Sequence, residues 1–209
     1  MATVALFGAT GKTGSRVLTR LLDRGDTVRA LARRASALPE HDRLVVIQGD
    51  VLDPAAVADT VEGADAVLSL FGQVKGSPRT LQTDGTANIV AAMQDSGATR
   101  LVTLSGGGLR APQDQPAFPD RLMRGALKLM AGHVLADAEG HLEILEKSHL
   151  DWTVVRGPRL TEDPRQGSYR AGWVGVGTGM KISREDLADF IVTQIDDRTF
   201  VHQMPFVSA

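Results

Sequence analysis

A glycine-rich segment near the start of the chain, Gly8-Ala9-Thr10-Gly11-Lys12-Thr13-Gly14, constrains the fold more than any other feature. It follows the apolar run Thr3–Phe7, which is typical of a buried strand, and it precedes apolar residues at helical spacing between Val17 and Leu22. Backbone N–H groups at the start of a helix have no partner within the helix, and the helix dipole adds positive potential there. A strand, a glycine-rich turn and a helix in this order therefore predict a phosphate-binding site.

The glycines of this segment have separate expected roles. Gly8 would allow the tight turn, Gly11 the close approach of a pyrophosphate, and Gly14 the close packing of helix on strand. Thr10 and Thr13 can add hydroxyl donors. The alternative is a turn that binds nothing, which the flanking strand and helix disfavour. The segment lacks the Gly-Lys-Ser/Thr ending of triphosphatase loops, and its first glycine gap differs by one residue from the common dinucleotide fingerprint.

Strand and helix patterns alternate along the rest of the chain. Further strands are predicted at Val28–Ala32, Leu44–Gln48, Ala64–Phe71, Arg100–Ser105 and Trp152–Arg156. Helices are predicted after Asp53-Pro54, from about Thr80 to Ser96, at Arg121–Leu129 and Leu135–Lys147, and after Ser183, with a loop at Pro112–Pro119. The alternation indicates an α/β fold, a Rossmann-like doubly wound parallel sheet in a single domain over residues 1–209. A small substrate-side region is expected in its carboxyl-terminal part, where the glycines of 172–179 are interpreted as a strand or loop.

Composition excludes several classes of function. The 209 residues carry a net charge of −2, which gives no electrostatic footprint for nucleic acid or an anionic membrane. No run approaches the ~18 apolar residues of a membrane span, and no signal peptide is visible. The five histidines show no metal-ligand spacing, and cysteine is absent, which fits the cytoplasm. We therefore expect a cytoplasmic monomer or small homo-oligomer that acts on a small molecule and needs no metal.

The end of the second strand indicates which dinucleotide binds. An acidic residue there would bind the ribose hydroxyls of NAD, whereas an arginine would pair with the 2′-phosphate of NADP. Here the strand runs into Arg33 and Arg34 with no acid, which favours NADP(H) over NAD(H), although two arginines can also simply begin a solvated loop. Asp50 follows the third strand and could accept a hydrogen bond from the adenine amino group, with the backbone of Val51 as donor; an ordinary turn carboxylate is the alternative.

Four segments together carry a family likeness: Gly8 to Gly14, the end of the second strand, Gly49-Asp50-Val51, and Ser148 to Arg156. In these the chain resembles the atypical short-chain dehydrogenase/reductases, the NmrA-like NAD(P)-binding group, and within it the biliverdin-IXβ reductases, also called flavin reductases. The resemblance implies an NADP(H)-binding Rossmann fold. It also implies a set of cofactor contacts: Gly8, Thr10, Gly11, Lys12 and Thr13 at the pyrophosphate, Arg33 at the 2′-phosphate, Asp50 and Val51 at adenine, Leu70 and Gly72 beside ribose, and Ser105, Gly106, Gly157 and Pro158 around the nicotinamide.

The chain lacks the catalytic pair of the standard short-chain dehydrogenases. Standard members use a tyrosine followed four residues later by a lysine, but the only tyrosine here is Tyr169 and position 173 is tryptophan. Counting back from the segment at 148–150 places the lysine near Ala138. Asp137 and His141 lie nearby at i and i+4, so they share one helix face and could replace the lysine; a solvated helix face is the favoured interpretation.

Ser105 and His141 are the candidate catalytic residues. Ser105 ends the fifth strand, where it could donate a hydrogen bond to the nicotinamide carboxamide or to substrate, or simply end the strand before three glycines. The sequence thus predicts an NADP(H)-dependent reductase that passes hydride to a flavin, quinone or tetrapyrrole. Two alternatives remain: an NmrA-like protein that senses NADP(H) without turnover, and an epimerase of the extended short-chain type, which the missing tyrosine disfavours.

Overall fold

The computed structural model describes residues 1–116 and 118–209, and the side chains of all these except 118–124 and 126–130. Its first half contains β1 (Thr3–Phe7), α1 (Lys12–Asp23), β2 (Thr27–Ala32), the 3-10 turn η1 (Ala35–Ala37), β3 (Leu44–Gln48), α2 (Pro54–Val61), β4 (Ala66–Ser69) and α3 (Leu81–Ser96). Its second half contains β5 (Arg100–Gly106), α4 (Phe118–Lys147), β6 (Asp151–Gly157), β7 (Arg159–Thr161), β8 (Arg170–Gly172), β9 (Lys181–Ser183), α5 (Arg184–Thr193) and β10 (Phe206–Ser208).

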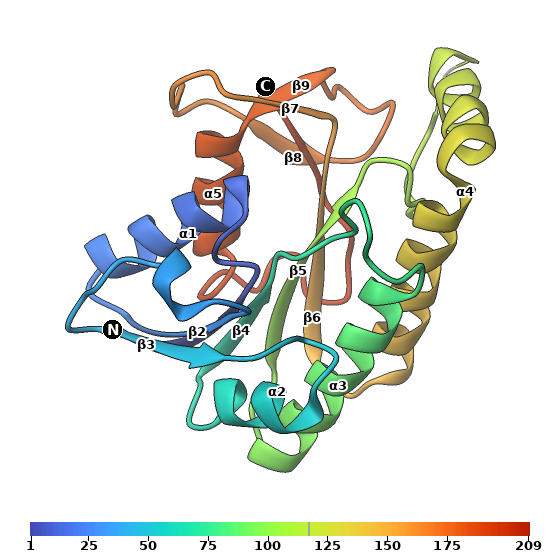
Figure 1. Cartoon of the computed structure of the whole chain (residues 1–209). Helices are drawn as coiled ribbons and strands as arrows, with labels where there is room; N and C mark the ends of the chain where they lie inside the picture. The colour runs from blue at the N-terminus through green and yellow to red at the C-terminus, as the bar shows by residue number, and fades with distance from the viewer. Residues whose placement is uncertain (117) are drawn as a thin grey trace.

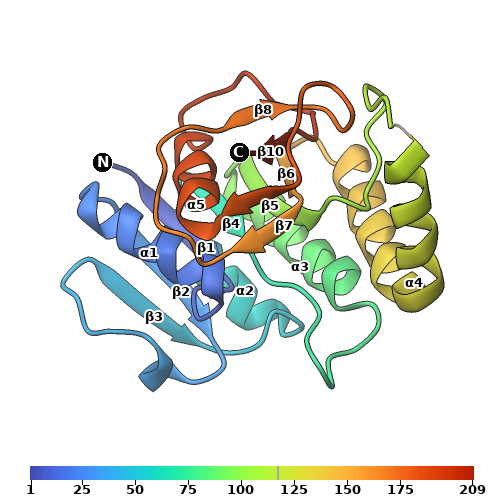
Figure 2. The same ribbon diagram turned by 90° about the horizontal axis from the view of Figure 1, so that it is seen from above.

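The central sheet has eight strands in the order β3-β2-β1-β4-β5-β6-β10-β8. All neighbours pair in parallel except β10 and β8, which are antiparallel at one edge. Helices α1 and α5 cover one face, and α2, α3 and α4 cover the other (Figures 1 and 2). This is the predicted Rossmann-like doubly wound fold. The strand order reverses between β1 and β4, and ligands of such sheets bind at the carboxyl ends of the strands beside that switch point.

Local signals in the sequence set the helix ends. Asp53 accepts a hydrogen bond from the N–H of Ala55 at 3.0 Å and is followed by Pro54 in the first turn of α2, as predicted. Gly97 closes α3 in the left-handed conformation with φ of 80°. The Ser183 hydroxyl accepts from the N–H of Asp186 at 3.0 Å and donates to its carboxylate at 2.7 Å, so this pair begins α5.

Two predicted boundaries differ in the structure. β4 ends at Ser69, and Leu70 and Phe71 leave the sheet after a last hydrogen bond from Leu70 N–H to Phe7, because the backbone here packs directly against the turn at Gly8. The predicted loop ends earlier than Pro119, since α4 begins at Phe118, and a proline is tolerated in the first turn of a helix.

The two helices predicted between 121 and 147 form a single element, α4. Ala131 has non-helical backbone angles (φ −141°, ψ 40°), so α4 consists of two helical segments joined at a kink between the predicted helices. Among the helices of residues 1–116 and 118–209, none combines the length and the apolar character that crossing a lipid bilayer requires.

Candidate functional site

The turn between β1 and α1 can be built only with glycine at two positions. Gly8 has φ of +85°, and a Cβ there would lie 2.7 Å from the backbone of Leu70 and Phe71. A Cβ on Gly14 would lie 2.0 Å from the carbonyl oxygen of Gly8. The turn, the start of α1 and the end of β4 are thus packed backbone on backbone. The expected roles of Gly8 in the turn and of Gly14 in packing are both visible in this geometry.

The start of α1 presents unsatisfied donors to the turn. Gly11 occupies the N-cap position, and no side chain caps the helix. The N–H of Gly11 donates to the carbonyl of Gly8 at 3.0 Å, and this bond closes the turn. The N–H groups of the first helical residues have no acceptor within the helix, because no helical turn precedes them. An anionic group above this turn would meet these donors and the positive end of the helix dipole.

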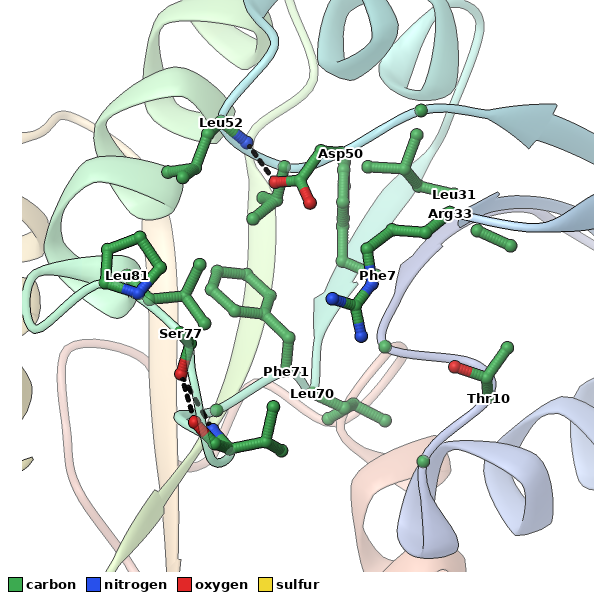
Figure 3. Close-up of a pocket in the computed structure, with 18 of the residues that line it drawn as sticks. Phe7, Thr10, Leu31, Arg33, Asp50, Leu52, Leu70, Phe71, Ser77 and Leu81 are labelled. Carbon is green, nitrogen blue, oxygen red and sulfur yellow. Dashed lines mark hydrogen bonds between the residues drawn. The ribbon is translucent and has the colours of Figure 1, made fainter.

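A cavity of about 340 Å³ opens at the carboxyl ends of β1 to β4, at the switch point of the sheet (Figure 3). Eight of the predicted cofactor residues line it together: Gly8, Thr10, Gly11, Arg33, Asp50, Val51, Leu70 and Gly72. We call this the adenosine-side cavity, after the half of a dinucleotide that would fit it. Its other walls were not predicted from sequence: Phe7, Leu31, Leu52, Phe71, Leu81 and the loop at 74–78. The sequence of the loop at 74–78 shows no hydrophobic periodicity, so it gave no indication that this loop lines a cavity.

Arg33 and Asp50, two of the charged residues that line the adenosine-side cavity, differ in their partners. Arg33 is exposed and points into the cavity, and no hydrogen bond or ion pair is found for its side chain among the described residues (Figure 3). Asp50 accepts a hydrogen bond from the N–H of Leu52 at 3.0 Å and shapes the turn after β3. Its other carboxylate oxygen takes no part in that bond. Val51 is buried, and its carbonyl accepts from the side chain of Asn88 at 3.0 Å.

Four residues predicted at the glycine turn and just after β2 do not line this cavity. Lys12 is exposed and forms an ion pair with Glu162 at 3.3 Å. Thr13 and Gly14 are buried in the packing of α1, and Arg34 lies just before η1, outside the lining. The structure therefore separates the two neighbouring arginines, and only Arg33 faces the cavity.

A second cavity of about 720 Å³ lies at the carboxyl ends of β5 and β6, and we call it the acceptor-side cavity. Gly106, Gly157 and Pro158, predicted beside the nicotinamide, all line it. The remaining lining residues were not predicted. They come from the loops after β5 and β8 and from the starts of β7, β9 and β10: Gly107, Gly108, Leu109, Arg110, Asp114, Pro116, Arg159, Val174, Gly175, Thr178, Gly179, Met180, Lys181 and Phe206. These segments are distant in sequence, so no local pattern could have joined them.

A buried ion pair holds the loops of the acceptor-side cavity. Arg156 is fully buried and donates to both carboxylate oxygens of Asp114 at 2.8 Å, and to the carbonyls of Leu109 and Met204. Asp114 also accepts from the N–H of Val174 at 3.0 Å. Burial opposes ionisation of Asp114, but the hydrogen bonds from Arg156 and from backbone N–H groups outweigh it and lower its pKa. This pair fixes the loop after β5 against the segment after β8.

Ser105 sits beneath the surface of the site. It is buried on β5, and its hydroxyl has no hydrogen-bond partner among the described residues. It does not belong to the lining of either cavity, whereas the next residue, Gly106, does. A buried hydroxyl without a hydrogen-bond partner lowers the stability of the folded protein by about 1–3 kcal/mol. The Ser105 hydroxyl, next to the acceptor-side cavity, is therefore available to donate a hydrogen bond to a ligand.

Asp137 and His141 do not lie on a solvated helix face, and that expectation is wrong. Both are buried, because α4 packs this face against α3 and β5. The carboxylate of Asp137 accepts from the N–H groups of Gln82 and Thr83, at the start of α3. Burial opposes its ionisation, but these bonds outweigh burial and lower its pKa.

His141 is 2% exposed, and both of its ring nitrogens are engaged inside the protein. Nδ1 is 2.8 Å from the hydroxyl of Thr86, and Nε2 is 3.1 Å from that of Thr103. Burial lowers its pKa to about 4, against a smaller opposite effect of Asp137. The structure therefore does not bring His141 to either cavity.

The expected lysine position is apolar in three dimensions as well. Ala138 is buried on α4 among the side chains that pack between α4 and the sheet. Val134, four residues before it, is apolar too. Among the described residues, no group of three or more His, Asp or Glu side chains is placed to hold a metal ion.

A parallel sheet with a glycine turn at its switch point and cavities along the carboxyl ends of its strands defines a Rossmann dinucleotide-binding protein. A family model described as NAD(P)H-binding matches residues 8–198. The chain therefore belongs to this NAD(P)H-binding family.

Relatives extend this result. YwnB of Bacillus subtilis, a protein without an assigned function, is 26% identical over 206 residues, which cover 93% of this chain and 91% of YwnB. A 3-diazoavenalumate denitrifying reductase from a Streptomyces species is 37% identical over 129 residues, or 56% of this chain and 42% of that reductase. The similar proteins thus include NAD(P)-dependent oxidoreductases, although the matched segment is less than half of the Streptomyces enzyme.

Solved structures share the fold over the whole chain. A short-chain dehydrogenase/reductase of Veillonella parvula in complex with NADP has a TM-score of 0.82 and 19% identity, covering 100% of this chain and 94% of that one. The anaerobilin reductase ChuY of Escherichia coli O157:H7 has a TM-score of 0.80 and 20% identity, covering 99% and 96%. At such identities these likenesses show the fold alone.

Proposed function

We propose that the protein is an NADP(H)-dependent reductase that transfers hydride to a planar, conjugated acceptor such as a flavin, quinone or tetrapyrrole. The observation that carries this proposal is the pair of cavities along one edge of the sheet. The adenosine-side cavity ends at the glycine turn, and the acceptor-side cavity begins at Gly106 and Gly157, where the nicotinamide is expected. One edge thus offers room for a dinucleotide and, beyond its reactive end, for a second molecule.

The residues of the adenosine-side cavity fit NADP(H). The unsatisfied N–H groups at the start of α1 would hold the pyrophosphate, and Asp50 would accept from adenine. Arg33 has no ion-pair partner among the described residues and would pair with the 2′-phosphate, which favours NADP(H) over NAD(H). When bound, the reduced cofactor supplies a hydride to the acceptor.

The class of acceptor is inferred from the absence of a catalytic tyrosine and lysine. Reduction of a simple ketone builds charge on one oxygen and needs a positioned acid, but the chain has no tyrosine followed four residues later by a lysine, the pair that standard short-chain dehydrogenases use. A reduced flavin or quinone spreads that charge over its rings, and water can supply the proton. The protein would contribute by stacking the acceptor at reacting distance. Ser105 would orient the carboxamide or the acceptor through its unpaired hydroxyl.

The similar proteins support a reductase. ChuY, which shares the fold, is an anaerobilin reductase, and this makes a linear tetrapyrrole one of the acceptors to test. The absence of cysteine supports action in the cytoplasm, and we expect a monomer or small homo-oligomer that binds neither nucleic acid nor membrane. A protein that only senses the ratio of NADP to NADPH is the second candidate, because among the described lining residues of the acceptor-side cavity the ionisable side chains are two arginines, one lysine and an aspartate that is already paired with Arg156.

The decisive experiment measures NADPH oxidation in the presence of flavins, quinones, tetrapyrroles and simple ketones. We expect turnover with one or more conjugated acceptors, little with ketones, and a modest loss of rate in Ser105→Ala. Efficient oxidation of a secondary alcohol would contradict the proposed chemistry. Tight NADPH binding with no turnover on any acceptor would instead favour the sensor.

A further inference from the structure

We propose that the acceptor carries an anionic group, a carboxylate or a phosphate, and that Arg110 and Arg159 bind this group at the acceptor-side cavity. This inference rests on the proposed function, since it names the substrate class of the same site. The side chains that line the cavity carry more positive than negative charge.

Among the residues whose side chains the structure describes, three cations and one acid line the acceptor-side cavity: Arg110, Arg159, Lys181 and Asp114. The acid is already neutralised, because Asp114 is bound through both oxygens to the buried Arg156, which is not a lining residue. Lys181 has one distant partner, Asp163, at 3.5 Å. The cavity is left with an excess of positive charge.

Arg110 and Arg159 have no acidic partner in the part of the chain that the structure describes. Both are exposed, and no ion pair or side-chain hydrogen bond is found for either. Most other described arginines differ: Arg16 and Arg20, for example, bind Glu185 at 2.8 Å and 2.7 Å. A guanidinium without a partner at a cavity is available for a bidentate bond to a carboxylate or phosphate.

The cofactor does not account for these charges. Its pyrophosphate and 2′-phosphate would be bound at the start of α1 and at Arg33, on the other side of the switch point from β5 and β6. Arg110 follows β5 and Arg159 follows β6, so both stand at the end of the site where the acceptor would lie.

The walls around these cations are apolar. Leu109, Val174 and Phe206 line the cavity, and Met180, although 66% exposed, lines it too. Apolar walls suit a conjugated ring system, and an exposed methionine adapts to flat surfaces. The combination fits an amphipathic acceptor, with a planar ring against these side chains and an anionic tail on the arginines.

Matched pairs of probes test the two anionic chemistries. FMN and riboflavin share one ring system and differ by a phosphate, and biliverdin and its dimethyl ester differ only in the charge of two propionates. Dissociation constants of all four would be measured by flavin fluorescence quenching or tetrapyrrole absorbance, with NADP⁺ bound. We expect the anionic member of at least one pair to bind roughly tenfold to a hundredfold more tightly than its neutral counterpart. The pair that shows the difference identifies phosphate or carboxylate as the anion.

The arginines are tested with Arg110→Gln and Arg159→Gln, and with Arg34→Gln as a matched control at an exposed arginine outside both cavities. We expect the first two to remove most of the difference between the members of the pair, and the control to keep it. The inference is overturned by equal affinities within both pairs, by no binding of either anionic probe, or by variants that weaken NADP⁺ as much as the probe.

These binding measurements need no turnover, so the two proposals fail separately. Preference for the anionic probe without NADPH oxidation would contradict the reductase and keep the anion site. Oxidation of NADPH together with equal affinities within both pairs of probes would keep the reductase and contradict the anion site.

Discussion

Two adjacent arginine side chains lie in different surroundings in this protein. Arg33 and Arg34 follow β2 together, yet only Arg33 faces the adenosine-side cavity (Figure 3). The backbone is extended at Arg34 (φ −136°, ψ 116°), and successive side chains of extended backbone point in opposite directions. The sequence could place a cation near the 2′-phosphate, but the choice between the two arginines needed the backbone.

We expect Arg33→Ala to weaken NADPH about tenfold to a hundredfold and to leave NADH affinity nearly unchanged, because a charge-assisted bond to the 2′-phosphate is lost. Calorimetric titration of both cofactors measures this. Arg34→Ala is the matched control and should keep the preference. Equal affinity of the unaltered protein for NADPH and NADH would contradict the role of Arg33, and loss of preference only in Arg34→Ala would move that role by one residue.

Loops that are far apart in sequence meet at the buried pair of Arg156 and Asp114. Arg156 stands on β6, Asp114 in the loop after β5, and Val174 in the segment after β8. An uncompensated buried charge is costly, so the pair acts as a single fixed point for all three segments. The walls of the acceptor-side cavity depend on this ion pair. The adenosine-side cavity has no lining residue in common with the acceptor-side cavity.

Asp114→Ala should lower the free energy of unfolding by about 3–5 kcal/mol, since it leaves Arg156 buried and unpaired. Acceptor binding should weaken with it, while NADP⁺ binding is kept. Urea unfolding and the two titrations measure these effects. Asp163→Ala, which removes an exposed ion pair with Lys181, is the control and should cost at most about 1 kcal/mol. A similar small loss in Asp114→Ala would show that the pair does not hold the loops.

The sequence predicted the elements that local signals determine. The turn from Gly8 to Gly14 and the caps at Asp53 and Ser183 depend on residues a few positions apart, and all are found in the structure. The acceptor-side cavity could not be predicted, because its walls meet only after β6, β8 and β10 pair. The burial of Asp137 was missed for the same reason: its partners, which include backbone N–H groups of α3 and the side chains of Gln73 and Thr83, lie more than 50 residues away in sequence.

At the scale of the whole molecule, a polar cluster is enclosed between helices and sheet. His141 on α4 contacts Thr86 on α3 and Thr103 on β5, so one side chain joins both layers on this face. Burial holds its pKa at about 4, below the usual 6.5, and the histidine is neutral in the folded protein at neutral pH. The unfolded chain binds a proton at this residue at higher pH than the folded chain does.

Stability should therefore fall as the pH drops from about 6.5 to about 4, by on the order of 3 kcal/mol from this residue alone. The sign follows because the unfolded state binds the extra proton in this window. Urea unfolding between pH 7.5 and 4.5 measures the slope. His141→Gln can keep hydrogen bonds to the two threonines but does not titrate, so its stability should change less over the window. Equal slopes for the two proteins would contradict the assignment.

Glycines of the site differ in how much room surrounds them. Gly8 and Gly14 are packed against backbone. Beyond the adjacent residues, no atom of the part of the chain that the structure describes lies within 4 Å of a Cβ built on Gly72 or Gly106, and neither glycine has a positive φ. Gly72 lines the adenosine-side cavity and Gly106 the acceptor-side cavity. Because the chain contains no cysteine, Gly72→Cys or Gly106→Cys would introduce its sole thiol. An environment-sensitive dye attached at position 72 would report cofactor binding, and one attached at position 106 would report acceptor binding. The two single-cysteine variants could therefore serve as optical sensors of the two ligands.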